Sequence, residues 1–315
     1  LLLLVAVRPL ALNEAIAPIY AIGTQGRRRL WVNGDPFMIA SRRPERAGVG
    51  PLDQTMEAVQ RGSVPERTVL ECNPDGKGSG ALVYPLRIGA GDSTSFHFAF
   101  PPAGGATFPR ARVDGEKRLV ETVGMWRRAT DQVTLSLPDD HIADARRASI
   151  GYLLLALDPK APRPGPLAHD SFWIRDAAYI GLALLQNGHS DAVKAYIPEV
   201  FDAQEADGRI PPIRGDDIPW DVDEWDAQGQ AIFLVSSYYR YTDDLDTLNT
   251  WYPALRKSAQ FIAALRDSER DTEGPARGLL PPSKSAEDLG REERHYYWDD
   301  FGAVVGLEEA AFAAR

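Results

Sequence analysis

The pattern of apolar and polar residues changes near residue 137. Before that point, short apolar or alternating runs with a period of two recur between clusters of Gly, Pro and Asp, which is typical of β-strands separated by turns. After it, apolar residues recur at three- and four-residue steps, which predicts amphipathic helices. The predicted strands are 1–7, 20–23, 28–40, 68–72, 81–88, 93–100 and 132–137.

One turn is specific enough to predict a hairpin. Asn33-Gly34 lies between two β-prone runs in WVNGDPFMIA, and this dipeptide suits the left-handed backbone of a two-residue hairpin loop. The run LLLLVAV at the start favours a buried strand. Several short strands with turns between them predict a β-sandwich-like domain over residues 1–136, with a linking helix near 115–128.

Six helices are predicted in residues 137–315, and no sheet. The second, fourth and sixth carry apolar or small residues round most of their circumference near their starts, so we expect them to form an inner layer that other helices enclose. The acidic turn DDLD at 243–246 is expected to cap the fifth helix. The predicted ranges are 142–158, 172–187, 189–206, 226–242, 245–267 and 297–313.

Aromatic and acidic residues precede each inner helix, and we call these three helix starts the mouths. They read HDSFWIRDAAYIG, WDVDEWDAQGQAIF and HYYWDDFGAVVG, and aligning them places Asp176, Asp226 and Asp299 at equivalent positions. Each acid alone could cap its helix. Capping does not account for the aromatic neighbours. If the helices form antiparallel hairpins, the mouths share one end and line a pocket suited to a sugar ring.

The helical region resembles the first half of the six-hairpin α/α toroid of glucoamylases, trehalases and processing α-glucosidases. FWIRDAAYIGLALL is similar to the Trp-x-Arg-Asp motif before the second toroid helix of glucoamylases. WDAQGQ and YYWDDF stand before the fourth and sixth helices, where those enzymes have substrate-contacting segments. Uncharacterised bacterial members also have a β-rich domain ahead of the toroid and a loop like GLLPPSKS.

The resemblance implies roles for particular residues. Asp299 would be the general acid, and Asp226 is the second candidate for that role. Arg175 and Asp176 would hold sugar hydroxyls, with Trp173 packed nearby. The full set expected to bind substrate is Trp173, Arg175, Asp176, Glu224, Trp225, Gln228, Tyr297, Trp298 and Asp300.

Glycoside cleavage needs one protonated carboxyl and a second, ionised one across the sugar. Aromatic surroundings and an ionised Asp300 would raise the pKa of Asp299, whereas the helix N-terminus would lower it, and the sequence leaves the balance open. In the resembled families the base comes from the later half of the ring. We therefore expect the base beyond residue 315, and an exposed apolar edge on a chain that carries only three hairpins.

The predicted function is an inverting glycoside hydrolase that acts on an α-glucoside or related glycan without a cofactor. One alternative is a carbohydrate-binding protein of the same fold without turnover. Others are a toroid polysaccharide lyase and a glycoside phosphorylase, because one fold hosts several chemistries. A lyase would favour a Tyr or His base with basic residues for uronates, and a phosphorylase would need a phosphate pocket.

Charge and composition exclude several classes of binding partner and bound group. A net charge of −10 argues against nucleic acid and anionic membrane surfaces, because phosphate binding needs clustered Lys and Arg. LLLLVAV lacks the flanks of a signal peptide and is far shorter than a membrane span, so a cytoplasmic protein is expected. The single Cys72 excludes an internal disulfide. His169, His189 and His295 lack metal-ligand spacing, so no metal is expected.

Overall fold

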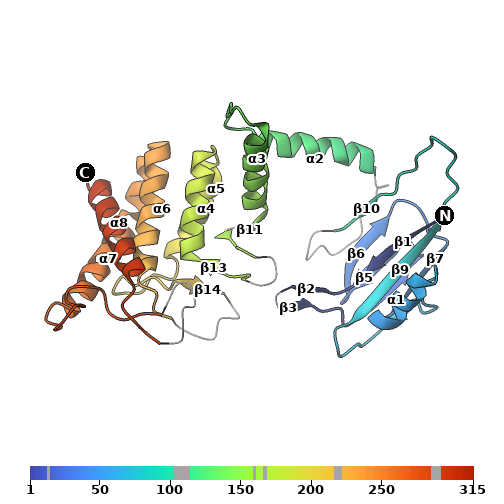
Figure 1. Cartoon of the computed structure of the whole chain (residues 1–315), viewed down its shortest axis with the longest axis horizontal. Coiled ribbons are helices and arrows are strands. Elements are labelled where there is room, and N and C mark those ends of the chain that lie inside the picture. The colour runs from blue at the N-terminus through green and yellow to red at the C-terminus, as the bar shows by residue number, and fades with distance from the viewer. Residues whose placement is uncertain (13–14, 102–113, 159–160, 166–168, 216–221, 285–291) are drawn as a thin grey trace. The chain divides into compact units, whose positions relative to one another are not determined.

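The computed structural model describes residues 1–12, 15–101, 114–158, 161–165, 169–215, 222–284 and 292–315. The chain divides into two compact units, Leu1–Met125 and Trp126–Arg315 (Figure 1). The division falls inside helix α2 (Gly115–Thr130), which covers the helix predicted near 115–128. Trp220, at the start of the second predicted mouth, lies outside the described residues.

Antiparallel sheets build the first unit. One sheet has the strand order β1-β9-β7, from β1 (Leu2–Val7), β9 (Gly78–Pro85) and β7 (Arg46–Pro51). A second has the order β10-β6-β5-β4-β8, from β10 (Phe98–Ala99), β6 (Asp35–Ala40), β5 (Arg29–Val32), β4 (Ile22–Gln25) and β8 (Val69–Leu70). A short pair joins β2 (Leu10–Leu12) to β3 (Ala15–Ala17). Buried residues of both larger sheets, including Leu82 and Leu30, belong to one apolar cluster.

The predicted hairpin is confirmed. Strands β5 and β6 pair antiparallel, and Asn33 and Gly34 link them with φ angles of 52° and 95°. Both values lie in the left-handed region that a two-residue hairpin loop with an Asn-Gly sequence requires. The Asn33 side-chain oxygen also accepts hydrogen bonds from the backbone N–H groups of Tyr20 and Ala21, at 2.8 and 3.0 Å.

In the β region, one strand is less buried than predicted, one predicted strand does not form, and one helix was not predicted. LLLLVAV forms strand β1, but at the edge of its sheet and mostly half-buried, whereas β9 is the buried central strand. QVTLSL at 132–137 forms no strand and lies in the segment that connects α2 to α3. Helix α1 (Leu52–Gln60), which packs on β7 and β9, was not predicted.

All six predicted helices form in the second unit. They are α3 (Asp140–Leu155), α4 (Ile174–Gln186), α5 (Ser190–Phe201), α6 (Asp226–Thr242), α7 (Leu245–Ser268) and α8 (Tyr297–Ala313). The expectation of no sheet was wrong in detail. Two ribbons of two-residue strands pair β11 (Leu157–Asp158) with β12 (Ala161–Pro162), and β13 (Phe172–Trp173) with β14 (Ile213–Arg214).

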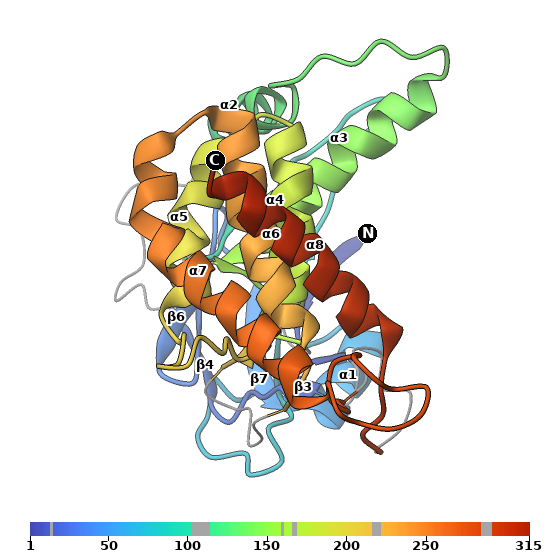
Figure 2. The same ribbon diagram turned by 90° about the vertical axis from the view of Figure 1, so that its left-hand side faces the viewer.

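Helix α6 lies between α4 and α8, and Figure 2 shows the three side by side. The described part of α6 is buried along most of its length, as expected for an inner helix. Helix α8 differs, because only Asp299, Ala303 and Gly306 are buried and its apolar side chains Phe301 and Val304 are exposed. The prediction of a fully enclosed inner layer therefore holds for α6 and not for α8 within this chain.

Glycines bring α6 and α8 into backbone contact. A methyl group added at Gly229 would overlap the carbonyl oxygen of Gly302, and one at Gly306 would lie 2.5 Å from the Gly229 Cα. Neither obstacle is a flexible side-chain end, so the helices would have to move apart. This close crossing sets where the first turns of the two helices meet.

We expect Gly229→Ala to lower the free energy of unfolding by about 1–3 kcal/mol or more, because overpacking forces backbone shifts. The matched control is Gly151→Ala in α3, where the added methyl would have its nearest neighbour at 3.9 Å. That variant should be stabilised by up to about 1 kcal/mol through higher helix propensity. Urea denaturation of both variants measures the difference, and equal effects would contradict the glycine contact.

Candidate active site

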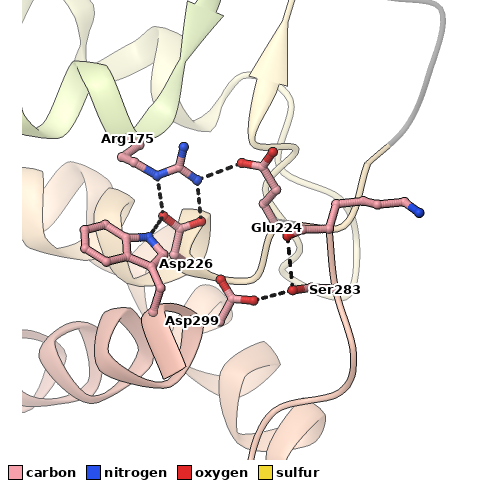
Figure 3. A network of polar contacts seen from close by, with 7 residues as sticks. Arg175, Glu224, Asp226, Ser283 and Asp299 are labelled. Carbon is pink, nitrogen blue, oxygen red and sulfur yellow. Dashed lines mark hydrogen bonds and ion pairs between the residues drawn. The ribbon is translucent and has the colours of Figure 1, made fainter. Parts of the chain in front are cut away.

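Arg175 joins the first two mouths. It lies in the first turn of α4, directly after strand β13, and its side chain is 14% exposed. Its Nε donates to Asp226 Oδ2 at 2.8 Å and its Nη2 donates to Asp226 Oδ1 at 3.0 Å (Figure 3). The same Nη2 donates to Glu224 Oε2 at 2.7 Å. Burial disfavours the charged guanidinium, but Asp226 and Glu224 more than offset this and raise the pKa of Arg175.

Trp298 brings the third mouth into the same network. Its indole Nε1 donates to Asp226 Oδ2 at 2.8 Å. The Asp226 carboxylate at the start of α6 is therefore bound both by Arg175 of α4 and by Trp298 of α8. The three mouths therefore converge at one end of the helices, as the sequence predicted. Both oxygens of Asp226, the second candidate for the acid, accept hydrogen bonds from Arg175.

Asp299 is the other buried carboxyl at this point. It is 2% exposed, in the first turn of α8, and its Oδ2 lies 2.5 Å from the hydroxyl oxygen of Ser283. Burial raises the pKa of Asp299 to about 6. The hydrogen bonds from Ser283 and from the Asp226 backbone N–H lower it, whereas the negative charges of Asp226 and Glu224 raise it.

Burial is thus the largest of these effects on the pKa of Asp299. The neighbouring charges that contribute are Asp226 and Glu224, not Asp300 as predicted. The Asp300 carboxylate instead accepts from the backbone N–H of Leu280 at 3.0 Å. Adjacent residues on a helix point in different directions, which explains the difference.

The three aligned acids lie in the first turns of their helices and are not the N-cap residues. The N-cap residues of α4, α6 and α8 are Trp173, Trp225 and Tyr296, and none makes a side-chain cap hydrogen bond. Asp226 is bound by Arg175 and Trp298, and Asp299 by Ser283. The Asp226 and Asp299 carboxylates therefore join the starts of the helices and the segment before α8.

Gln228 has a different role from the predicted sugar contact. Its side chain is buried, and its amide accepts from Ile210 N at 2.8 Å and donates to Ile210 O at 3.1 Å. A substrate could use this amide only by breaking a buried pair of hydrogen bonds, which is costly. Gln228 therefore secures the backbone near Ile210 against α6.

The predicted aromatic residues differ in accessibility. Tyr297 and Trp298 are 67% and 42% exposed, so both present surface to solvent. Trp173 is half-buried, and Trp225 is buried with its ring 6.0 Å from that of Phe261. The indole N–H groups of Trp173 and Trp225 are buried without a hydrogen-bond partner in the described structure. Asp176 is half-buried in the first turn of α4, beside Arg175.

Ser283 is the site residue that the sequence did not reveal. It is fully buried and comes from the segment between α7 and α8. The stretch GLLPPSKS contains two serines, Ser283 and Ser285, and nothing in its pattern singles out one of them. Only the fold shows that this serine meets Asp299.

No group of three or more His, Cys, Asp or Glu side chains among the described residues is arranged to hold a metal ion. No helix among them has the length and apolar character needed to cross a membrane.

Comparison with known proteins gives a likeness in fold. No family model and no curated protein matches the chain. A solved structure that matches is a bacterial glucoamylase complexed with acarbose, with a TM-score of 0.53 and 11% sequence identity. The match covers 94% of this chain and 47% of the glucoamylase chain, so the 315 residues span about half of that protein. At this identity the likeness shows a shared fold and does not carry over the activity.

The buried Asp299 gives stability a predictable pH dependence. Its folded pKa of about 6 lies above the ordinary value of 3.8, so folding favours the protonated form. The contribution is fully present below about pH 4 and is lost as pH rises through 6, at a cost of about 3 kcal/mol. Asp299→Asn should therefore be more stable than the wild type at pH 8 by up to this amount.

Urea denaturation of both proteins from pH 4.5 to 8 measures this difference. Comparing the two at each pH removes the contribution of the other titrating groups. A stability difference that stays constant over this range would contradict a raised pKa at Asp299.

Proposed function

We propose that this chain carries the acid-bearing half of a glycoside hydrolase site that cleaves an α-glucoside or similar glycan with inversion. The observation that carries the proposal is Asp299, a buried carboxyl whose pKa is raised to about 6 beside the Arg175–Asp226 pair. Two carboxyls with different environments are what acid-catalysed glycoside cleavage requires. The fold shared with a glucoamylase supports the same reaction class.

In the proposed reaction, Asp299 gives its proton to the glycosidic oxygen as the bond between that oxygen and the anomeric carbon breaks. The leaving group departs as an alcohol, and Asp299 becomes a carboxylate. Arg175 and Asp176 hold hydroxyls of the sugar. The exposed faces of Tyr297 and Trp298 offer stacking surfaces at the edge of the same mouth.

The remaining part is the base that activates water on the opposite face of the sugar. In an inverting site it stands about 6.5–9.5 Å from the acid. We propose that α3 to α8 form the first three hairpins of a six-hairpin toroid, that residues 1–136 form a β-sandwich, and that the base lies outside these 315 residues. The match covers 47% of the glucoamylase chain, so about half of that protein has no counterpart in these residues, which supports the proposal.

The inner helices carry a surface consistent with that arrangement. A cavity between α4, α6 and α8 is lined mainly by apolar residues, among them Tyr179, Phe233, Phe301 and Val305. Tyr179 and Phe301 are 50% and 66% exposed. Apolar surface of this kind is normally covered in a folded protein, and further toroid helices would cover it.

Sugar binding by the mouths can be tested without turnover. Acarbose, the ligand of the matched glucoamylase, is a suitable probe, and the indole N–H signals of the tryptophans report its position by NMR. Millimolar acarbose should shift the signal of Trp298 and leave that of Trp31, in strand β5 of the first unit, unchanged. Asp176→Asn should weaken the response about tenfold or more, as expected for one hydrogen bond to a charged group.

Shifts confined to tryptophans other than Trp173, Trp225 and Trp298 would contradict a sugar site at these mouths. Binding that persists unchanged in Asp176→Asn would contradict the role of that residue. Binding at the mouths without turnover in a protein that includes the base would favour a carbohydrate-binding protein instead.

A further inference from the structure

Ser283 is held between two of the mouths by its backbone. Its N–H donates to Arg294 O at 2.9 Å, and Arg294 N–H donates back to Ser283 O at 3.1 Å. The next residue is tied to the mouth of α6, because Lys284 N–H donates to Asp223 O at 2.8 Å. These bonds fix the backbone on both sides of the serine, so the position of its hydroxyl depends on a single side-chain torsion.

The hydroxyl has two acceptors within reach and one proton to give. Asp299 Oδ2 lies 2.5 Å from the Ser283 Oγ, and Lys284 O lies 3.3 Å from it (Figure 3). The shorter contact, to a carboxylate oxygen, is the stronger one, because hydrogen bonds to charged acceptors are shorter and about twice as strong as neutral ones. The Ser283 proton therefore goes to Asp299 when that carboxyl is ionised.

We propose that Ser283 is a positioning residue for the proton donor: its hydroxyl donates to Oδ2 of Asp299 and holds this carboxyl in place for proton transfer. As Asp299 releases this proton, charge develops on the carboxylate and the Ser283 bond strengthens. The proton donor role on which this inference rests belongs to the proposed function.

The other charged groups around Asp299 are accounted for. Glu224 and Asp226 come from the mouth of α6, and both are held by Arg175 from α4. Next to Ser283, the Lys284 Nζ lies 3.4 Å from Glu293. The hydrogen bond from Ser283 acts against burial and against the acids, and lowers the pKa of Asp299. Removing the hydroxyl should therefore raise it.

The test uses the 315-residue chain with ¹³C-labelled aspartate and follows the Asp299 carboxyl signal by NMR as pH changes. The signal is assigned as the one missing from Asp299→Asn. Ser283→Ala should move the midpoint to higher pH. Ser283→Cys, which keeps most of the side-chain volume but is only a weak donor, should move it the same way and serves if the alanine variant folds poorly.

The matched control is Ser236→Ala. Ser236 is also fully buried, but its hydroxyl donates to Glu309 O at 3.3 Å, away from Asp299. This variant should lose some stability and keep the wild-type midpoint. An unchanged or lowered midpoint in folded Ser283→Ala or Ser283→Cys overturns the proposal, as does an equal shift in Ser236→Ala.

This titration needs no substrate, so its outcome is separate from that of the proposed function. If the Asp299 midpoint rises in the Ser283 variants but the protein neither binds nor cleaves sugars, the contact between Ser283 and Asp299 is supported and the proposed glycosidase function is contradicted. If the protein cleaves sugars but the Asp299 midpoint is unchanged in the Ser283 variants, the glycosidase function is supported and the positioning role of Ser283 is contradicted.

Discussion

Arg175→Ala is expected to lower the free energy of unfolding by about 3–5 kcal/mol. The guanidinium makes three hydrogen bonds to two carboxylates whose side chains are 1% and 8% exposed. Breaking a buried pair by removing one partner leaves charges without compensation in a poorly solvated place, and losses of this size follow. Urea denaturation at pH 7 measures the effect.

Arg147→Ala is the matched control. Arg147 also contacts two acids, Asp131 and Asp144, at 2.8 and 2.9 Å, but all three side chains are well exposed. Exposed pairs are screened by water and contribute little, so this variant should be close to wild type. If both arginine variants lost the same stability, the buried network would not be the cause.

Asp299→Asn is expected to lower kcat by about 10²–10⁴ in a protein that also contains the base, with KM nearly unchanged. This range is the usual contribution of a positioned general acid. Asparagine has the same shape and can still accept from the Asp226 backbone N–H, but it has no proton to transfer. Steady-state kinetics on an α-linked glucoside measure the change. An unaltered kcat would remove Asp299 from the role of acid.

The helices could be predicted closely where strong end signals coincide with clear periodicity. The range predicted for α6 agrees with Asp226–Thr242, and α7 begins at Leu245 as predicted. Asp243 adopts the left-handed conformation that ends α6, and Asp244 caps α7 by accepting from Thr247 N–H. The acidic turn thus marks both boundaries in the sequence, and in the fold the Asp244 carboxylate also accepts from Lys194 and Tyr238.

The site could be predicted in outline, because aromatic and acidic residues recur at the starts of alternate helices. The roles within it could not, because they depend on which loop meets which helix. Gln228 resembles a substrate contact in sequence, yet it pairs with the backbone of Ile210. Ser283 has no distinctive neighbours in sequence, yet it contacts Asp299.

The central claim is that Asp299 protonates the leaving oxygen, and a change of leaving group tests it most directly. An α-glucoside with a sugar leaving group needs that proton, whereas α-glucosyl fluoride releases a fluoride ion without it. In the protein that contains the base, Asp299→Asn should lose about 10²–10⁴ in kcat/KM on the glucoside and far less on the fluoride. An equal loss on both substrates would show that Asp299 supports binding or folding and is not the acid.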